Sequence, residues 1–397
     1  MRAIVAGAWF DGERHHREPV TIVVDDGGRI AEVVAGERTA GLPVERCGFV
    51  MPGLVEAHCH LFLDGGELDF GARNRYLEAP FERMMDVARA NVARSLAAGV
   101  TLARDAGDRY GVNHAARAES STLAIRSAGI ALRRPKRYGA FMAREVASLE
   151  DALAAVDEIA KTADDLKIIE TGIIDFESGT VKGGPQFDID TLSAIVRRAH
   201  GAGLRTFAHC SGTDGIAVAV DAGVDSIEHG FFMTRAILER MADRGIAWVP
   251  TFSPVEFQWR RPEFAGWSPE TVRKLRAILD AHEEHVGLAA RMGVPLVAGS
   301  DAGSPGVEHG SALIDEIERF IACGVPTDRA LRSATSLPRR LWGCEAADVS
   351  RGARADLTML EGDPFVDPAA LRRVRGIVRG GAGAAARSAS EPGIGAR

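Results

Sequence analysis

The feature that most limits the fold of this chain is a repeated order of segments between residues 51 and 347. A stretch of helical period ends at a glycine and a short apolar run follows at once, as in DIDTLSAIVRRAHGAG followed by LRTFAHC. Glycine ends helices because it adopts the left-handed conformation without strain, and a short apolar run is typical of a strand buried on both faces. Repeated helix–strand units of this kind predict an α/β fold with a parallel sheet.

Eight candidate strands can be counted in this region. They lie near residues 54–57, 100–104, 130–133, 166–170, 205–209, 226–228, 246–249 and 295–299. Eight units in about 290 residues fit a (β/α)8 TIM barrel better than a doubly wound sheet, because no GxGxxG sequence follows the first strand. We therefore predict a TIM barrel over residues 51–347.

The two ends of the chain have a different pattern. Residues 1–50 and 348–380 consist of short strand-like runs separated by turn signals such as DDGG. We predict that these two segments pair into one small β-sandwich module. Residues 381–397 are rich in Gly, Ala and Ser, and we predict that they form a disordered tail.

Composition limits the partners and the location of the protein. The 48 Lys and Arg residues against 55 Asp and Glu give a net charge of −7, and no basic block could follow a phosphate backbone, so we expect no nucleic-acid partner. Without an apolar run of about 18 residues, we expect no membrane partner either. The five cysteines are widely separated and indicate free thiols in a reducing compartment. We expect a cytoplasmic protein that acts on a small molecule, and the sequence leaves open whether it forms a homo-oligomer.

Side chains of the metal-ligand type stand at the ends of four predicted strands. His58 and His60 lie two residues apart in MPGLVEAHCHLF, so both imidazoles point to the same face of a strand and could reach one ion. His209, His229 and Asp301 end three further strands. A lone HxH pair has an equally ordinary interpretation as a polar strand end. Because TIM barrels collect active-site residues from the carboxyl ends of different strands, the coincidence favours one metal site.

Lys167 lies inside the apolar run DLKIIETG. Desolvating a lysine is costly, so the ordinary interpretation is a snorkelling or surface side chain. In a metal site a lysine with a lowered pKa has another use, because its neutral amine can take up CO2 and form an anionic carbamate that bridges two cations.

Taken together, these segments resemble the amidohydrolase superfamily, and within it the prolidase-like and imidazolonepropionase-related members. The resemblance rests on MPGLVEAHCH, AGVTLARDAG, LKIIETG with PQF at 185–187, AHCSG, SIEHG and AGSDAG, which occur in this order at barrel spacing, and on ARADLTMLEGDPFVD near the carboxyl end. It covers essentially residues 1–380.

The resemblance implies a two-metal centre. One ion would be bound by His58, His60 and Asp301, the other by His209 and His229, and carboxylated Lys167 and a hydroxide would bridge both. Zinc suits these ligands, and manganese and iron are alternatives. Asp301 would also be the catalytic residue that takes the proton from the hydroxide and passes it to the leaving amine.

Two departures from the family pattern bear on the reaction. Cys210 and Ser211 follow His209, where many relatives have a second histidine, and Gly212 stands where single-metal deaminases have a glutamate. Together with Lys167, these residues favour hydrolysis of a C–N amide-type bond in a dipeptide or an N-acyl amino acid. Two alternatives are hydrolysis of a cyclic amide, such as a lactam or imide, and deamination of an aminated ring. A third, from another class, is a catalytically silent barrel retained for binding.

Substrate contacts are expected from the loops after the strands. Tyr138 and Arg137 follow the third strand, Lys182 follows the fourth and His309 follows the last. Each of them is a candidate substrate contact, and each has an ordinary interpretation as a solvated or loop-capping side chain. The aromatic stretch 252–267 is expected to form either a pocket wall or a dimer contact.

Overall fold

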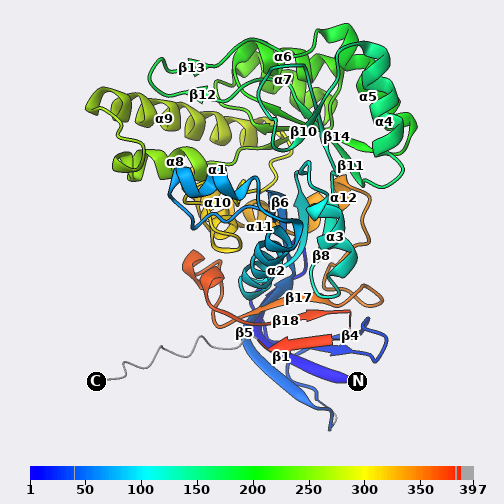
Figure 1. Cartoon of the computed structure of the whole chain (residues 1–397). Helices are drawn as coiled ribbons and strands as arrows, with labels where there is room; N and C mark the ends of the chain where they lie inside the picture. Colours follow the sequence, from blue (N-terminus) through cyan, green and yellow to red (C-terminus); the bar gives the residue numbers. More distant parts are fainter. Residues whose placement is uncertain (40, 381, 386–397) are drawn as a thin grey trace, which may run out of the picture. The chain divides into compact units, whose positions relative to one another are not determined.

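The computed structural model of this chain describes residues 1–39, 41–380 and 382–385. The chain divides into two compact units (Figure 1). Unit 1 comprises Met1–Gly53 and Ala347–Arg397, and unit 2 comprises Leu54–Ala346. These bounds lie close to the division predicted from the sequence.

Unit 1 is built on one sheet that contains strands from both ends of the chain. The strand order is β19-β18-β17-β5-β1-β3-β4, with β2 paired to β1. The strands are β1 (Arg2–Phe10), β2 (His15–His16), β3 (Val20–Val24), β4 (Ile30–Ala35), β5 (Val44–Pro52), β17 (Asp356–Leu360), β18 (Val374–Arg379) and β19 (Ala382–Ala385), and the 3-10 helix η2 spans Pro368–Arg372. β17 pairs antiparallel with β5, which joins the carboxyl-terminal segment to the amino-terminal one. The predicted β-sandwich, with two sheets face to face, stays a prediction.

The core of unit 1 follows the two-residue period of its strands. Ile4 and Ala6 of β1, Ile22 of β3, and Leu357 and Met359 of β17 belong to one buried cluster. Residues two apart on a strand share a face, so these side chains gather on one side of the sheet. Burial of this face stabilises the sheet and joins the two chain ends through apolar contacts.

The segment that was predicted to form a disordered tail contains one strand, Ala382–Ala385. These residues form β19, which pairs antiparallel with β18. Strand pairing uses backbone N–H and C=O groups, so a segment of small side chains can extend a sheet although its composition resembles that of a linker. Residue 381 and residues 386–397 of the predicted tail lie outside the described residues.

Unit 2 alternates short buried strands with helices. Its strands are β6 (Leu54–Cys59), β7 (Val100–Asp105), β8 (Ala124–Ser127), β9 (Ala131–Arg133), β10 (Ala143–Glu145), β11 (Asp165–Ile169), β12 (Ile174–Asp175), β13 (Thr180–Val181), β14 (Arg205–Cys210), β15 (Ser226–His229) and β16 (Ala247–Val249). The predicted strands at 54–57, 100–104, 166–170, 205–209, 226–228 and 246–249 are confirmed within a few residues. The strand predicted at 130–133 corresponds to β9, and the sequence analysis missed β8. At 295–299 the structure has a single β-bridge, at Leu296, in place of the predicted strand.

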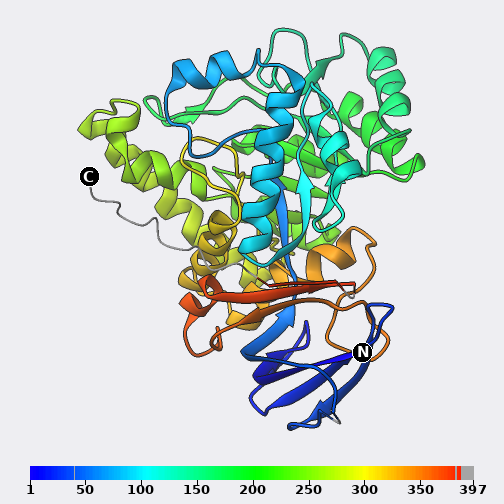
Figure 2. The same ribbon diagram turned by 60° about the horizontal axis from the view of Figure 1, so that its bottom comes forward.

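The helices of unit 2 begin and end at the signals that the sequence contains. They are α1 (Phe70–Tyr76), α2 (Phe81–Ala97), α3 (Val112–Glu119), α4 (Leu149–Ile159), α5 (Ile189–Gly201), α6 (Thr213–Ala222), α7 (Arg235–Arg244), α8 (Ser253–Arg260), η1 (Pro262–Phe264), α9 (Pro269–Met292), α10 (Ser311–Ala322), α11 (Thr327–Ser333) and α12 (Ser336–Leu341). The side chain of Thr234 caps α7, and left-handed Gly245 ends it. α4 packs beside α5 (Figure 1) and α2 beside α3 (Figure 2). Within the described ranges, no helix has both the length and the apolar composition to span a bilayer.

Parallel backbone pairing runs from strand to strand through unit 2. β6, β7 and β8 form one sheet, and β10-β9-β11-β14-β15-β16 form another. Bridges then join Trp248 of β16 to Leu296, and Cys59 of β6 to Ala302. The strands of these two sheets therefore share one direction and bring their carboxyl ends to one edge, whereas β12 and β13 pair antiparallel as a separate hairpin. The two sheets are separate in this description, so closure into a TIM barrel stays a prediction.

Gly48 of β5 gives a direct test of packing in unit 1. A Cβ atom at this position would lie 2.0 Å from the carbonyl oxygen of Glu361, so Gly48→Ala must displace backbone. We expect a loss of about 1–3 kcal/mol in the free energy of unfolding, measured as a lower midpoint in thermal or urea unfolding. Gly201 of α5 has open space around its would-be Cβ, so Gly201→Ala is the control and should not destabilise. An unchanged midpoint in Gly48→Ala would contradict this packing.

Candidate metal centre

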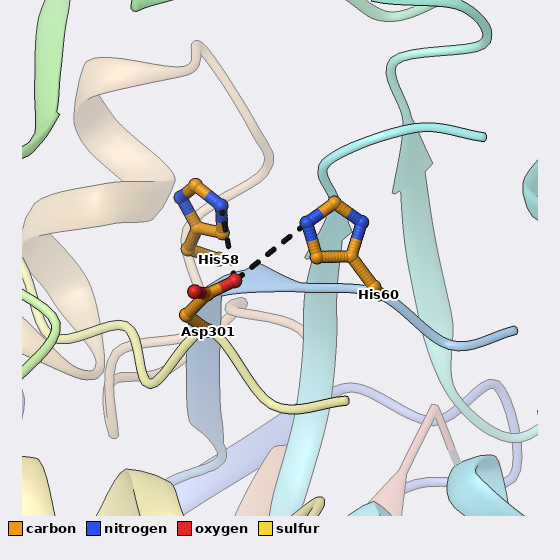
Figure 3. Close-up of side chains that lie close together, drawn as sticks. All are labelled: His58, His60 and Asp301. Carbon is orange, nitrogen blue, oxygen red and sulfur yellow. Dashed lines mark ion pairs between the residues drawn. The ribbon is translucent and has the colours of Figure 1, made fainter. Parts of the chain in front are cut away.

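The end of β6 and the segment after α9 bring His58, His60 and Asp301 together (Figure 3). One ligand atom of each lies within 4.8 Å of the others. The Oδ1 atom of Asp301 lies 3.7 Å from Nε2 of His58 and 3.6 Å from Nε2 of His60. Cys59, between the two histidines, points elsewhere, and its thiol contacts the carbonyl of Arg104. The alternation expected of a strand therefore places both imidazoles on one side.

The remaining predicted ligands lie against this group. The Nζ atom of Lys167, on β11, is 3.1 Å from Nε2 of His58. His209 on β14 and His229 on β15 have ring centroids 4.5 Å apart, and the ring of His229 lies 5.1 Å from that of His58. The structure thus brings together all six side chains that the sequence singled out as ligands.

Two members of the group have strained backbones. His229 has a φ of 67° and Asp301 a φ of 57°, and Thr251, whose hydroxyl lies 2.7 Å from Nδ1 of His229, has a φ of 47°. Left-handed conformations of residues other than glycine cost roughly 1–3 kcal/mol each and persist where the surrounding structure imposes them. The surrounding structure therefore holds these side chains in position at a cost in stability, as is common at functional sites.

Burial keeps the four imidazoles neutral. Loss of hydration lowers the pKa of His60 and of His209 to about 3, and it holds the pKa of His58 and His229 well below the usual value. The amine of Lys167 adds to this effect in all four. A neutral imidazole has a free nitrogen lone pair, which is the form that binds metal ions.

Burial acts in opposite directions on the two remaining members. It lowers the pKa of Lys167 to about 8, and it raises the pKa of Asp301 to about 6. In both cases the charged form is disfavoured because it has lost water. Lys167 is 1% exposed, so its amine cannot reach solvent by snorkelling.

A buried carboxylate that the sequence analysis missed orients His58. Oε2 of Glu228 lies 2.5 Å from Nδ1 of His58, while Oε1 accepts hydrogen bonds from Arg104 (3.0 Å) and from Ser226 (2.6 Å). A carboxylate on Nδ1 fixes the tautomer and directs the Nε2 lone pair into the site. The only signal in the sequence was the position of Glu228 in SIEHG, directly before His229.

A second missed carboxylate, Glu56, joins the two segments that supply the ligands. Its side chain accepts hydrogen bonds from the backbone N–H of His58 (3.0 Å) and from both the backbone (2.9 Å) and the hydroxyl (2.6 Å) of Ser300. Burial raises the pKa of Glu56 to about 7. The contacts hold His58 close to Asp301, which follows Ser300 directly.

The donor set fits divalent metal ions. Nε2 of His209 is buried and has no hydrogen-bond partner among the described residues. Leaving such a nitrogen unpaired is costly, and an ion would satisfy it. Four neutral imidazoles, one carboxylate and an amine that can be carboxylated form an N/O ligand set typical of zinc and related ions.

A cavity of about 750 Å³ opens over these residues. All six predicted ligands line it, together with Tyr138, whose ring centroid is 5.1 Å from that of His209. Its other walls come mainly from residues 63–87 and from the segments after β9, β11, β15 and β16.

The other predicted substrate contacts lie elsewhere. Arg137 donates a hydrogen bond to the carbonyl of Gly184, Lys182 is exposed, and His309 is buried. None of these three side chains is among the described residues that line the cavity. A residue that follows a strand in the sequence therefore need not reach the cavity, because the conformation of the loop determines where its side chain lies.

The aromatic stretch 252–267 contributes to the cavity through other residues. Pro254, Val255 and Gln258 of α8 line it, whereas none of the five aromatic side chains of this stretch does so among the described residues. Phe252 is buried, and Phe257 packs on Phe264.

The expected free thiols are confirmed for all five cysteines.

The chain combines an α/β fold with a candidate metal site at strand ends. The model of the Amidohydrolase family matches residues 49–382, and the chain belongs to this family. Enzymes of this family generally use divalent metals and act on small molecules, and this chain is a hydrolytic enzyme that acts on C–N bonds.

Relatives and solved structures agree with this assignment. An uncharacterized protein of Mycobacterium tuberculosis is 33% identical over 356 residues, which cover 89% of each chain. A Xaa-Pro dipeptidase crystallised with methionine in its active site is 25% identical, with a TM-score of 0.81 over 97% of this chain and 99% of that one. A prolidase in complex with N-methylphosphonate-L-proline is 26% identical, with a TM-score of 0.78 over 96% and 99%. The resemblance to prolidase-like amidohydrolases is thereby confirmed.

The contact between Glu228 and His58 predicts an effect on metal affinity. In Glu228→Gln the imidazole loses its anionic partner, so we expect zinc affinity to fall about 10–100-fold, measured by competition with a chromophoric chelator. Ser226→Ala is the control, because it removes a hydrogen bond to the same carboxylate without touching His58, and its loss should be much smaller. Equal affinities in the two variants would show that Glu228 does not orient the ligand.

Proposed function

We propose that this protein is a two-metal hydrolase that cleaves the amide-type bond of a dipeptide or an N-acyl amino acid. The observation that carries the proposal is the position of the buried Lys167 amine, 3.1 Å from Nε2 of His58 and surrounded by the other candidate ligands. A lysine in this place has no apolar or surface role. It has a clear role as a bridging ligand once it is carboxylated.

The ligands divide between two ions in this proposal. His58, His60 and Asp301 would hold the first ion, His209 and His229 would hold the second, and a carbamate on Lys167 would serve both. Bound divalent ions polarise the scissile carbonyl and lower the pKa of water, which makes attack possible at neutral pH. We propose zinc, with manganese or iron as alternatives, and a cytoplasmic location.

Electrostatics support carboxylation of Lys167. The site contains four imidazoles and one amine, and Asp301 is the one carboxylate among the six ligands. Two divalent ions there would add a charge of +4 to a buried volume. Conversion of the amine to a carbamate replaces a potential cation with an anion, so it reduces the repulsion between the ions.

Asp301 is placed to move the proton. Its side chain lines the cavity, and its Oδ2 accepts a hydrogen bond from the hydroxyl of Ser304 at 3.0 Å. A carboxylate in this position can accept a proton from the attacking water and release it to the leaving amine. Tyr138, on the cavity wall near His209, is proposed as a substrate contact, and Arg137, Lys182 and His309 have no such support.

We further propose that unit 2 closes into a (β/α)8 barrel. The support is the sequence of parallel contacts from β6 through β16 to Leu296, and from Ala302 back to Cys59 of β6. β8 and β9 then occupy one barrel position, interrupted near Gly129. In this arrangement the ligands stand at the carboxyl ends of the strands, where TIM barrels have their active sites.

The deaminase alternative has less support. A family deaminase would need a glutamate at position 212, but Gly212 has a φ of 84° and its would-be Cβ lies 3.1 Å from Val181. A glutamate would be strained in this conformation. Hydrolysis of a cyclic amide uses the same ligands and stays the second candidate.

Carboxylation of Lys167 predicts a dependence on CO2. Its pKa is lowered to about 8, so the neutral amine that reacts with CO2 is scarce below this pH and abundant above it. Metal-free protein reloaded with zinc should bind two equivalents with bicarbonate at about pH 9 and fewer in CO2-free buffer at about pH 6. Lys167→Met should remove the bicarbonate effect. Two bound equivalents in Lys167→Met, measured by elemental analysis, would contradict the bridging role.

The reaction class is tested with a substrate panel and an Asp301 variant. Metal-loaded protein should release a new carboxylate and an amine from dipeptides or N-acyl amino acids, and Asp301→Asn should lower kcat about 10²–10⁴-fold because the proton acceptor is lost. Cyclic amides and aminated rings complete the panel. Turnover of an aminated ring with release of ammonia, and of no amide, would overturn the proposal.

A further inference from the structure

The cavity extends well beyond the metal-ligand group. Its volume of about 750 Å³ lies within the range of roughly 300–1,000 Å³ that is typical of sites for ligands of drug size. The added space is bounded by the loop after β6, by α1 and by the start of α2. An amide bond at the ligands therefore leaves room for a long substituent that runs along α1.

α1 is fixed relative to the ligand group. The guanidinium of Arg73 donates hydrogen bonds to the carbonyls of Asp64 (2.6 Å) and Glu67 (3.0 Å), and also to that of Gly303 (2.7 Å), two residues after Asp301. The backbone N–H of Gly306 donates to the carbonyl of Gly65 at 2.8 Å. The guanidinium of Arg73 therefore has a structural role, and these bonds hold α1 in place as a wall of the cavity.

Two other arginines on this wall have no ion-pair partner among the described residues. Arg75 on α1 and Arg83 on α2 line the cavity and are exposed, and neither has an ion pair within the described part of the chain. Further along α2, Arg89 pairs with Glu119 at 2.7 Å and Arg94 lies 3.7 Å from Asp64. Two arginines without a carboxylate partner thus line the same space.

The acidic side chains of the wall do not neutralise them. Among the described residues that line the cavity, the carboxylates other than Asp301 are those of Asp64 and Glu67. Asp64 lies beside Arg94 and accepts a hydrogen bond from the backbone of Gly66, and Glu67 accepts one from the backbone of Asp69. An acidic group on a ligand would therefore meet Arg75 and Arg83 without a competing partner.

Apolar side chains complete this part of the cavity. Phe70 of α1 is 52% exposed and Ile173 is 43% exposed, which is unusual for large apolar residues, and both line the cavity with Phe176. The ring of Phe70 packs on Phe264, with centroids 4.6 Å apart, so it is held in place. Exposed apolar groups at a cavity are typical of a ligand contact.

We propose that Phe70, Arg75, Arg83 and Ile173 form a second subsite that binds an acidic group carried on an apolar or aromatic arm of the substrate. The inference rests on the proposed amide hydrolysis and specifies its substrate class. The preferred substrates are amides in which a hydrocarbon or aromatic arm, remote from the scissile bond, ends in a carboxylate. The apolar part lies on Phe70 and Ile173, and the carboxylate receives charge-assisted hydrogen bonds from the arginines.

The experiment compares matched amides on metal-loaded protein. Each pair has the same scissile bond and the same aryl-alkyl arm, and the arm ends either in a carboxylate or in its neutral primary amide. We expect kcat/KM to be about ten-fold higher for the charged member. In the double variant Arg75→Met/Arg83→Met this ratio should fall toward one, whereas Arg75→Lys/Arg83→Lys should retain most of it. Arg235→Met, which removes an exposed arginine from α7 outside the cavity, should leave the ratio unchanged.

A binding measurement separates this inference from the proposed reaction. An aryl-alkyl carboxylate and its amide are titrated by calorimetry into each variant, so that no turnover is needed. A preference for the carboxylate that disappears in Arg75→Met/Arg83→Met supports the subsite even when no amide of the panel is cleaved. An equal preference in wild type and double variant places the carboxylate on the metal ions and overturns the subsite. Equal kcat/KM for the charged and neutral amides in the wild type overturns it as well.

Discussion

Loss of hydration around six side chains is the constraint on which the rest of the site depends. His58, His60, His209 and His229 are each less than a tenth exposed, and Lys167 is almost completely buried. Water cannot stabilise their charged forms, so the four imidazoles are held neutral as lone-pair donors and the pKa of Lys167 is lowered to about 8. Buried nitrogen lone pairs that have no hydrogen-bond partner are unfavourable. A positive ion between these side chains would satisfy them. Metal binding satisfies this requirement with the residues that are present.

The fold supports the ligand group through contacts that lie behind it. Arg104 and Glu228 are buried together and hold His58 by its second nitrogen, while Glu56 joins His58 to the segment before Asp301. Removal of one partner from such a network leaves an uncompensated buried charge, which costs more than the bond itself contributes. The strained backbones of His229 and Asp301 fit the same picture, because the surrounding structure must outweigh their conformational cost.

Strand ends could be predicted from the sequence because two local rules suffice. Glycine after a helix and an apolar run marked most strands, and the polar residue at the end of each run gave His209, His229 and Asp301. Contacts across the sheets have no local signal, so Glu228 was missed although it lies next to a predicted ligand. Lys182 and Arg137 were expected near the substrate because of their place after strands. The loops turn them away, and loop conformation depends on long-range packing that one sequence does not reveal.

Anomalous diffraction from crystals of the zinc-loaded protein tests the central claim most directly. The account predicts two peaks in the cavity, one in contact with His58, His60 and Asp301 and one in contact with His209 and His229. Both should lie within bonding distance of density that extends from Nζ of Lys167. A single peak at the first group, with a free Lys167 amine and full amidase activity in the same preparation, would contradict the two-metal centre.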